Sequence, residues 1–218
     1  MSKKEEGIAK LIFEQSNRLG CIIRFNNTPK VANESVAEHS FYVTFIAMLL
    51  ADYLAEARPD VNPERVMRLA LLHDLEEVIS GDIISIIKQG DLRKALDEIN
   101  VKSMTHILKD MEPEIQRSYF DLWSEAKDKT TLEARIVEAA DIIAACAYCL
   151  KEVHLGSYYF RETLEFLVKK ILRYLSALPE LREVFRAISE YALGYLTEDK
   201  KILDDLNRAV RITFEKEG

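Results

Sequence analysis

The sequence predicts an all-α fold, and three observations lead to this prediction. Apolar residues recur with a spacing near 3.6 along almost the whole chain, and no segment alternates as a half-buried strand would. The 218 residues include only 7 glycines and 5 prolines, roughly half of the usual ~12% share, which is too few turn-forming residues for a sandwich or barrel. Hydrophobic residues make up 48% of the chain, so it can bury a core. We expect a single domain over residues 1–218.

The first predicted helix has its apolar residues on one face. That face is formed by Ile8, Leu11, Ile12 and Leu19. Residues 20–33 interrupt the pattern with several loop-forming residues, which predicts a long loop before the next helix.

The next two helices have recognisable starts. The hydroxyl of Ser35 can cap a second helix, and Glu38 three residues later completes a capping box. This helix should run to about residue 57. Asn62-Pro63 is typical of an N-cap followed by proline in the first helical position, so a third helix should begin there and end near Glu77. Gly81 marks a further break.

The remainder of the chain is also predicted to be helical. Helices are expected over residues 91–110, 113–127 and 131–154, with two or three more over 158–216. Thr130 and Glu133 form a second possible capping box, and Gly156 should end that helix. Breaks are expected near Pro179 and Thr197. The motifs described below lie within about 6–155, and we expect the C-terminal helices to pack on that part.

Composition and charge exclude several classes of protein. The longest uncharged stretch, Ser40–Ala51, is well under the ~18 residues of a membrane span, and the first residues contain no apolar run of a secretory signal. A net charge of −7 argues against binding to a nucleic-acid polymer. The three cysteines, Cys21, Cys146 and Cys149, imply no disulfide framework, which fits a cytoplasmic setting. Cys146-x-x-Cys149 resembles a redox pair, but its Ala-rich helical context favours two core cysteines.

Four residues stand out as candidate metal ligands. His39 lies near the start of the second helix, His73 and Asp74 are adjacent, and Asp141 lies in an otherwise apolar helical segment. Imidazole nitrogens and carboxylate oxygens together suit a divalent ion such as Mn²⁺, Co²⁺, Fe²⁺ or Mg²⁺. Each residue alone has a plainer explanation, because a helical histidine is more often a core or surface group and a His-Asp pair arises by chance. The four in this order are far more specific.

These residues give the chain a resemblance to the HD-domain metal-dependent phosphohydrolases, and within them to the YfbR-like 5′-deoxynucleotidases. The resemblance covers roughly residues 6–155. It is carried by Arg24-Phe25, by residues 35–40 (Ser-Val-Ala-Glu-His-Ser), by residues 73–82 (His-Asp-Leu-Glu-Glu-Val-Ile-Ser-Gly-Asp) and by Ala140-Asp141. It implies a helical HD-domain bundle in which His39, His73, Asp74 and Asp141 hold one divalent metal ion. It further implies hydrolysis of deoxyribonucleoside 5′-monophosphates to nucleoside and phosphate.

The resemblance also implies roles for residues around the metal. Glu77 would take part in proton transfer, Asp82 would lie close to the nucleotide and Arg24 would contact the phosphate. On a continuous helix Glu77 shares the face of His73 and Asp74, which supports its role. Each has an alternative: a surface salt bridge for Glu77, a cap after the glycine for Asp82 and a surface ion pair for Arg24.

The sequence also gives expectations for three further side chains near these motifs. Glu76, about 100° away from Glu77 on a helix, is expected to be solvated. Lys88 is a second candidate for phosphate binding. Phe25 stands where some relatives carry tryptophan, so we expect it to face the sugar and to give only a moderate preference for deoxyribose.

The sequence therefore predicts a cytoplasmic metal-dependent phosphohydrolase that acts on a small nucleotide and forms a homodimer, with Mn, Co, Fe, Mg and Zn all left open as the metal. Two alternatives remain: an HD phosphohydrolase that acts on a triphosphate or cyclic nucleotide, and a catalytically silent HD protein that binds metal or nucleotide. Retention of all four ligand types together with Glu77 argues against the silent protein.

Overall fold

Helices account for nearly all regular structure in the computed structural model, which describes residues 3–83 and 90–196. The elements in chain order are α1 (Lys3–Lys10), a π-helical segment (Leu11–Ser16), α2 (Asn17–Leu19), α3 (Val36–Ala55), α4 (Pro63–Leu72), α5 (Glu77–Ser80), α6 (Gly90–Leu108), α7 (Pro113–Asp128), α8 (Leu132–His154), a 3₁₀ turn (Tyr158–Phe160), α9 (Arg161–Ala177), a second 3₁₀ turn (Pro179–Leu181) and α10 (Arg182–Leu196). The described residues contain no strand, only an isolated antiparallel bridge between Ile23 and Ser35. The all-α prediction is confirmed.

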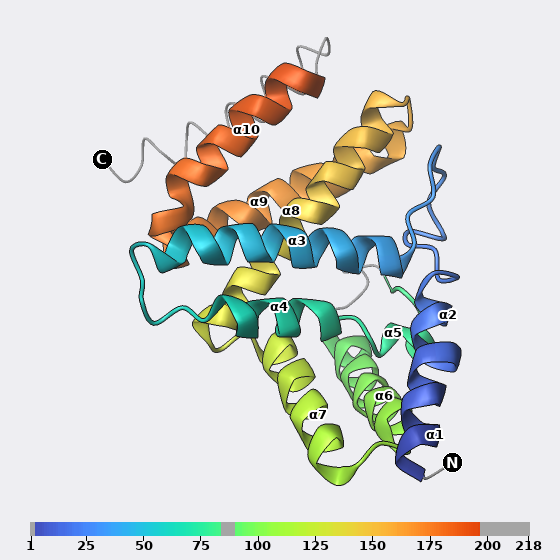
Figure 1. The fold of residues 1–218 in the computed structure, drawn as a ribbon. Coiled ribbons are helices and arrows are strands. Elements are labelled where there is room, and N and C mark those ends of the chain that lie inside the picture. Colours follow the sequence, from blue (N-terminus) through green and yellow to red (C-terminus); the bar gives the residue numbers. More distant parts are fainter. Residues whose placement is uncertain (1–2, 84–89, 197–218) are drawn as a thin grey trace.

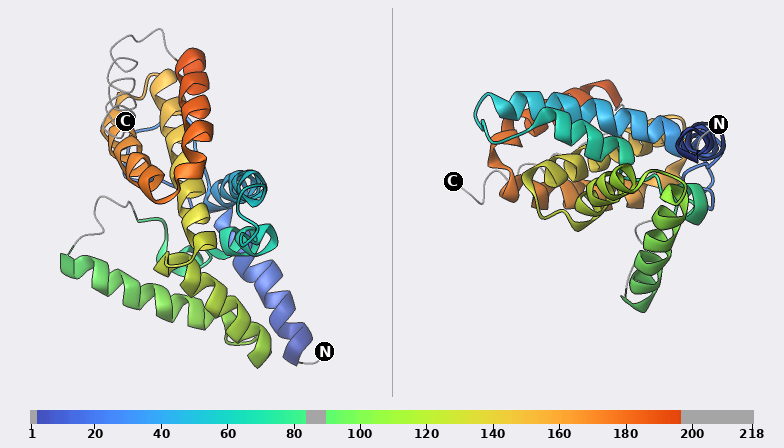
Figure 2. Two further views of the ribbon diagram at one scale, coloured as in Figure 1. Left: turned by 90° about the vertical axis from the view of Figure 1, so that its left-hand side faces the viewer. Right: turned by 60° about the horizontal axis from the view of Figure 1, so that its bottom comes forward.

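Helices α3, α4 and α8 form the centre of the molecule. They contribute most of the largest buried apolar cluster, which includes Val43, Leu50, Leu69 and Ile136. Helices α1, α6 and α7 extend to one side of this centre, and α9 and α10 lie on the other (Figures 1 and 2). Helix α8 contacts α3, α4, α7 and α9, so its side chains reach both halves. This central position brings distant parts of the sequence to one place.

The starts of α3 and α4 agree with the sequence prediction. Ser35 accepts a hydrogen bond from the backbone amide of Glu38, whose carboxylate accepts one from the amide of Ser35, so the predicted capping box is confirmed. Asn62 caps α4 through the amide of Arg65, with proline in the first turn.

The end of α4 was predicted wrongly. The helix ends at Leu72, and a short turn leads to α5, which begins at Glu77 and ends before Gly81 at a φ of +73°. The pattern of apolar residues continues through this turn because Leu75 and Val78 still reach a buried cluster. Sequence periodicity alone therefore could not show that the helix stops at His73.

The first helix was predicted only in part. Leu11 and Leu19 pack against a buried cluster, but Ile8 and Ile12 are exposed. The segment Leu11–Ser16 is π-helical, and its wider turn rotates the following residues away from a face drawn at 3.6 residues per turn.

The later elements also follow the prediction with small differences. Helix α8 is capped by Thr131 through the amide of Ala134, one residue after the predicted Thr130 cap. It ends before Gly156, which has a φ of +96° as a helix stop requires. The predicted break near Pro179 is confirmed, whereas the break near Thr197 lies outside the described residues.

Helix α8 also holds the loop that precedes α3. The carboxylate of Glu152, which is fully buried, accepts hydrogen bonds from the amides of Val31 and Ala32 at 2.7 and 2.8 Å. The hydroxyl of Tyr148 donates to the carbonyl of Ala32, and that of Ser157 donates to the carbonyl of Pro29. Residues 20–35 are thereby fixed against α8 although they form no regular element.

Among the helices that the structure describes, none is long and apolar enough to span a membrane.

Candidate metal centre

Three of the predicted ligands meet where the start of α3 lies beside the end of α4 (Figure 1). His39 projects inward from the second turn of α3, and His73 and Asp74 follow directly after α4. Nε2 of His73 lies 3.0 Å from Oδ2 of Asp74, and Nε2 of His39 lies 3.8 Å from the same oxygen. One ligand atom from each residue falls within 4.8 Å of the others, which is the spacing of a shared metal ion.

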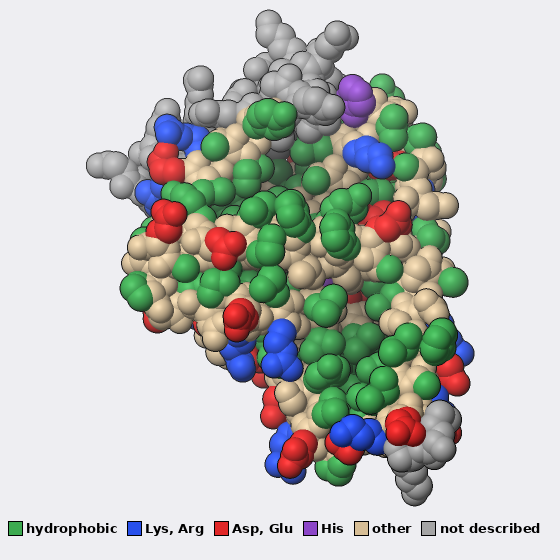
Figure 3. All heavy atoms as spheres, viewed as in Figure 1, with side chains coloured by type: hydrophobic (Ala, Val, Ile, Leu, Met, Phe, Trp, Pro, Cys, Tyr) green, Lys and Arg blue, Asp and Glu red, His purple; other side chains and the backbone are tan. Residues whose placement is uncertain are grey.

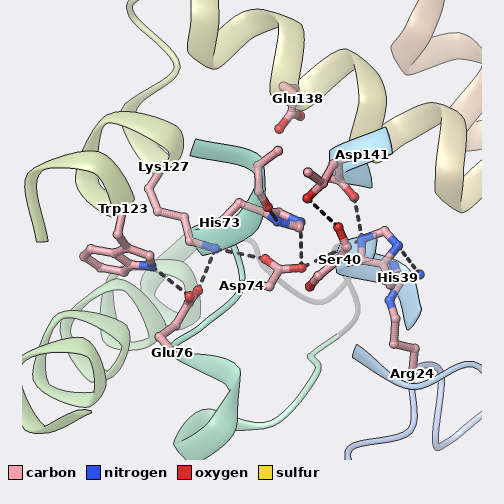
Figure 4. A network of polar contacts seen from close by, with 12 residues as sticks. Arg24, His39, Ser40, His73, Asp74, Glu76, Trp123, Lys127, Glu138 and Asp141 are labelled. Atoms are coloured by element: carbon pink, nitrogen blue, oxygen red, sulfur yellow. Dashed lines mark hydrogen bonds and ion pairs between the residues drawn. The ribbon is translucent and has the colours of Figure 1, made fainter. Parts of the chain in front are cut away.

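Asp141 reaches the same place from α8. Its Oδ1 lies 3.1 Å from Nε2 of His39 (Figure 4). Burial alone would raise the pKa of Asp141, but the hydrogen bond with His39 and the nearby His39 and His73 rings outweigh it and hold this pKa below its usual value. The carboxylate therefore stays ionised, as a metal ligand must. The four predicted ligands come together from three separate parts of the chain.

The donor set suits a divalent cation. It offers two imidazole nitrogens and two carboxylates, a mixture that Mn²⁺, Fe²⁺, Co²⁺ and Zn²⁺ accept. Nε2 of His73 is buried and lies 3.0 Å from Oδ2 of Asp74 without the geometry of a hydrogen bond, while Nδ1 contacts the carbonyl of Ala70 at 2.7 Å. A carbonyl only accepts, so Nδ1 carries a proton, and in the neutral ring the lone pair of Nε2 faces the centre. The residues present therefore fit a metal ion.

The other oxygen of Asp74 is held by a residue that the sequence analysis did not consider. Nζ of Lys127, on α7, lies 3.2 Å from Oδ1 of Asp74 and 2.6 Å from Oε1 of Glu76 (Figure 4). Nε1 of Trp123 donates to Oε2 of Glu76 at 2.7 Å. These four residues form one network, in which Lys127 occupies Oδ1 and leaves Oδ2 of Asp74 to face the histidines.

Glu76 is part of this network and not a surface residue. It is 1% exposed, so the expectation that it is solvated was wrong. The reason is the break after α4: the turn at residues 73–76 no longer follows a helical wheel, and Glu76 points toward Trp123 and Lys127.

Glu77 lies beside the candidate ligands in a buried position. It is 6% exposed, and its Oε2 has no hydrogen-bond partner among the described residues. Burial raises the pKa of Glu77 well above its usual value, and the neighbouring carboxylates of Asp74 and Asp82 raise it further. A raised pKa favours proton exchange by a carboxyl group placed beside the reacting groups.

Arg24 is also buried, and it contacts a candidate ligand directly. Its Nη1 pairs with Oε2 of Glu34 and lies 2.9 Å from Nδ1 of His39. Because arginine can only donate, Nδ1 of His39 accepts here, and Nε2 carries the proton toward Asp141. A metal ion held by Nε2 would require this proton to move to Nδ1, and Arg24 would then have to turn away from the ring. Burial and the positive charge of Arg24 lower the pKa of His39, which keeps this ring neutral.

Phe25 and Asp82 are joined by a hydrogen bond. The amide of Phe25, which has a φ of +51°, donates to Oδ2 of Asp82 at 2.9 Å. The phenylalanine ring is 6% exposed, stacks on Tyr148 at a centroid distance of 5.5 Å and meets Phe160 edge-on. A residue other than glycine rarely adopts this φ, so the ring contacts and the hydrogen bond must hold it.

The remaining predicted residues divide into two groups. Lys88 lies outside the described residues. Cys146 and Cys149 are buried in α8, so the prediction of core cysteines is confirmed, and burial raises the pKa of Cys149 to about 12.

Around the candidate metal centre, sequence reasoning missed Lys127 and Trp123 and placed Glu76 wrongly. A lysine near the end of an amphipathic helix looks like a solvated residue, and 53 positions separate Lys127 from Asp74. The one available signal is Trp123, the single tryptophan of the chain, at the spacing of four residues that puts it on the same helix face as Lys127.

Comparison with known proteins gives a family match over most of the chain. The profile of the family described as 5′-deoxynucleotidase YfbR-like matches residues 12–191. A 5′-deoxynucleotidase of Photorhabdus laumondii is 30% identical over 164 residues, which cover 73% of this chain and 82% of the relative. Another from Erwinia tasmaniensis is 32% identical over 151 residues, covering 68% and 76%.

Solved structures share the fold. An HD-domain phosphohydrolase from Listeria innocua superposes with a TM-score of 0.80 at 24% identity and covers 95% of this chain and 99% of its own. An HD phosphohydrolase from cyanophage S-2L, solved with dA and one catalytic Zn²⁺ ion, has a TM-score of 0.55 at 18% identity, covering 94% and 96%. At these identities the likeness concerns the arrangement of helices.

Proposed function

The chain belongs to the family of YfbR-like 5′-deoxynucleotidases, and from this premise we propose that it hydrolyses deoxyribonucleoside 5′-monophosphates with the help of one divalent metal ion. Water attacks the phosphorus, the bond between phosphorus and O5′ breaks, and the nucleoside leaves with a proton on O5′. The observation that carries the proposal is the cluster of His39, His73 and Asp74, whose ligand atoms lie within 4.8 Å of one another. Asp141 lies 3.1 Å from His39, and Glu77 is buried nearby.

His39, His73, Asp74 and Asp141 would hold the metal. When bound, a divalent ion lowers the pKa of a bound water and polarises a phosphoryl oxygen. Its identity is left open among Mn, Co, Fe, Mg and Zn, since the mixed nitrogen and oxygen donors suit several of them.

Glu77 is the proposed proton carrier. A carboxylate with a raised pKa, next to the ligands and with one oxygen free of hydrogen bonds, can take the proton of the attacking water and return one to O5′. Asp82 lies near enough to Glu77 to raise its pKa, which supports a place for Asp82 beside the nucleotide.

Arg24 and Phe25 are the proposed contacts to phosphate and sugar. A guanidinium group next to His39 lies where a phosphate on the metal would need a positive partner, and its planar fork suits phosphate oxygens. To bind phosphate, Arg24 would exchange part of its pairing with Glu34. Phe25 is covered by Tyr148 and Phe160 on the ring contacts described above, so a sugar would meet only its remaining edge. Lys88 is kept as a second candidate for the phosphate.

A phosphate-release screen tests the function. The purified enzyme, stripped of metal and reloaded with each candidate ion, is given deoxyribonucleoside and ribonucleoside monophosphates, deoxyribonucleoside triphosphates and cyclic nucleotides. We expect release from monophosphates, with a moderate preference for the deoxy form. Release only from triphosphates or cyclic nucleotides would assign another HD phosphohydrolase activity, and metal binding without any release would assign a silent binding protein.

A double variant tests the metal assignment in the same assay. His73→Ala with Asp74→Ala should lose bound metal and phosphate release together. Full metal content and full activity in this variant would refute the assignment. The exposed pair Arg93 and Asp97, changed to alanine, is a suitable control because it lies on α6 away from the centre.

The proposal also covers the compartment of the enzyme, its domain organisation and its assembly. Three free cysteines, two of them buried, support a reducing compartment such as the cytoplasm. We also propose that residues 1–218 act as one domain and that the enzyme forms a homodimer. Contacts of α9 and α10 with α8 support the single domain.

A further inference from the structure

We propose that Glu34 is a positioning residue for the metal centre. When His39 holds a metal ion, Glu34 takes the place of Arg24 on the outer nitrogen of the ring, and this exchange releases Arg24 to the phosphate of the substrate. The inference rests on the proposed function, but it concerns a residue outside the sequence motifs. It is drawn from three buried side chains, since Arg24, Glu34 and His39 are 8%, 7% and 0% exposed.

The backbone places Glu34 opposite Arg24. Ile23 and Ser35 form the isolated antiparallel bridge, and the amide of Arg24 donates to the carbonyl of Glu34 at 2.9 Å. Glu34 also directly precedes Ser35, the cap of α3, the helix that carries His39. The side chains of Arg24 and Glu34 can therefore change partners while their backbone hydrogen bond stays in place.

Arg24 occupies the nitrogen of His39 that is turned away from the other candidate ligands. Its Nη1 pairs with Oε2 of Glu34 and lies 2.9 Å from Nδ1 of His39. On the opposite side of the ring, Nε2 lies 3.1 Å from Oδ1 of Asp141 (Figure 4). Because Arg24 only donates, Nδ1 accepts and Nε2 carries the proton. In this arrangement Nε2 has no lone pair to offer a metal ion.

A ligand role for His39 reverses its two nitrogens. To hold a metal ion Nε2 must give up its proton, and in the neutral ring the proton then lies on Nδ1. The charge of the ring is unchanged, because water takes one proton and returns another. A protonated Nδ1 and a guanidinium are both donors, so Arg24 cannot remain against the ring.

Departure of Arg24 leaves a buried carboxylate without its partner. Among the residues that the structure describes, Arg24 is the only cation paired with Glu34, and the nearby hydroxyl of Tyr148 already donates to the carbonyl of Ala32. An unpaired buried charge is costly. The new donor on Nδ1 of His39 meets this need, because the ring and Glu34 contact the same guanidinium nitrogen.

The exchange has a consequence for each end of the site. A carboxylate that accepts from the outer nitrogen of a metal-bound histidine fixes the ring and makes it a stronger ligand. Arg24, freed from Glu34, can direct both arms of its guanidinium at phosphate oxygens. Binding of metal and binding of phosphate are therefore coupled through Glu34 as well as through any direct contact between the two.

The plainer explanation is that Glu34 only neutralises Arg24. In that case Glu34 influences the metal through Arg24 alone, and its influence disappears once Arg24 is removed. Under our proposal Glu34 acts on His39 itself, so its influence persists without Arg24. A double-variant cycle separates the two explanations.

The first experiment measures the dissociation constant of Zn²⁺ alone by calorimetry, without substrate. Arg24→Met removes the competing donor, so this variant should bind Zn²⁺ at least as tightly as the unmodified protein. Adding Glu34→Ala to Arg24→Met should weaken binding by ~10–100-fold, the usual effect of losing a residue that orients a metal ligand. Adding Glu34→Gln instead keeps an acceptor oxygen and should recover part of this loss.

Folding is controlled within the same set. Because Arg24→Met with Glu34→Ala removes both charges, it leaves no buried ion unpaired. Glu38→Ala removes the capping box of α3 but neither contact of His39, so it should lower the melting temperature with little change in the affinity for Zn²⁺. Circular dichroism of each variant confirms the helical content.

The second experiment observes the ring directly by nitrogen-15 NMR, which distinguishes protonated from unprotonated ring nitrogens. The chain has only four histidines, so assignment by single substitutions is practicable. Zn²⁺ should move the proton of His39 from Nε2 to Nδ1. In Arg24→Met this proton should be protected from exchange with solvent, and adding Glu34→Ala should abolish the protection. Exposed His106 should show no change.

Two results would overturn the inference. Equal affinity for Zn²⁺ in Arg24→Met with and without Glu34→Ala would make Glu34 a counterion only. A proton that stays on Nε2 of His39 after Zn²⁺ has bound would exclude the exchange.

Failure of the proposed function is distinguishable from either result. Phosphate release is measured separately on the unmodified protein, so the inference can fail while the hydrolase activity stands. Normal exchange at His39 without phosphate release from any nucleotide would refute the activity and leave the role of Glu34 intact. Absence of Zn²⁺ binding by the unmodified protein would refute both.

Discussion

Glu77 differs from the other carboxylates of the centre in the surroundings of one of its oxygens. Asp74 is held by Lys127, and Asp141 contacts His39, but Oε2 of Glu77 is buried with no hydrogen-bond partner among the described residues. A buried polar atom of this kind costs stability, so its retention indicates a functional demand at that position.

The first prediction follows from this position. Glu77→Gln keeps the shape of the side chain but cannot carry the proton, so kcat should fall by ~10²–10⁴-fold, the usual contribution of general acid–base catalysis. Metal content and melting temperature should stay at the level of the unmodified protein. A change in KM with unchanged kcat would instead make Glu77 a binding residue.

Lys127 gives the second prediction. Lys127→Met removes the contact that fixes Oδ1 of Asp74, so the dissociation constant of the metal should rise by ~10–100-fold, as found for residues that orient metal ligands. Titration calorimetry with the metal alone measures this without any turnover.

A matched variant separates this effect from simple loss of stability. Glu76→Gln breaks the charge pair with Lys127 but leaves the lysine beside Asp74 and still accepts from Trp123. It should lower the melting temperature with little change in metal affinity. Equal loss of metal affinity in both variants would show that the network acts only through folding.

At the scale of residues, the sequence predicted the candidate ligands, which a local motif identifies. It did not predict side-chain positions that depend on packing against distant parts of the chain. The pattern of His39, His73, Asp74 and Asp141 identified residues that the fold does bring together. Glu76 could not be placed correctly, because its orientation follows from the turn after α4 and from partners on α7.

At the scale of elements, the helix starts could be predicted because capping is local chemistry. Ser35 with Glu38 and Asn62 with Pro63 are short signatures whose hydrogen bonds close within four residues. The π-helical segment and the early end of α4 could not be predicted, because both keep apolar residues in contact with a buried cluster that only the whole fold defines.

The loop before α3 supplies the third prediction. Glu152→Ala removes the acceptor for the amides of Val31 and Ala32, which should cost about 1–3 kcal/mol of unfolding free energy. Because this loop carries Arg24 and Phe25, KM for a monophosphate should rise, with at most a small change in metal affinity through the contact of Arg24 with His39. Stability is measured by denaturant unfolding and KM by phosphate release.

Two further variants sharpen that test. Glu152→Gln keeps one oxygen acceptor and should restore part of the loss in KM. Glu98→Ala, an exposed glutamate on α6, should change neither quantity. An increase in KM that is equal for Glu152→Ala and Glu98→Ala would contradict a positioning role of the loop.

At the scale of the whole molecule, the centre joins residues that are far apart in the chain, below a face of α3 on which hydrophobic side chains gather (Figure 3). His39 and Asp141 are separated by 102 positions, yet lie 3.1 Å apart between α3 and α8. The unfolded chain cannot hold these ligands together, so a metal ion that binds here stabilises the folded state alone.

The fourth prediction measures this coupling. At a free metal concentration 100 times the dissociation constant, binding adds ~2.7 kcal/mol, which for a chain of this size corresponds to a rise of about 5–10 °C in melting temperature. Chelation should remove this rise and renewed addition of metal should restore it. The variant His73→Ala with Asp74→Ala should show no response; an equal response would place the stabilising ion elsewhere.

The attachment of residues 20–35 to α8 has a consequence for how such an enzyme can diversify. Two of the proposed metal ligands lie on core helices and the other two directly follow α4, so a change in length there would disturb packing. Arg24 and Phe25, in contrast, lie on a segment held by a few hydrogen bonds from Glu152, Tyr148 and Ser157. If Arg24 and Phe25 have the proposed roles, substrate preference is encoded largely outside the core helices, and the contact of Arg24 with His39 joins the loop to the metal centre. New specificities could then be selected by substitution or insertion at exposed residues of the loop, while the helices around the proposed ligands keep their packing.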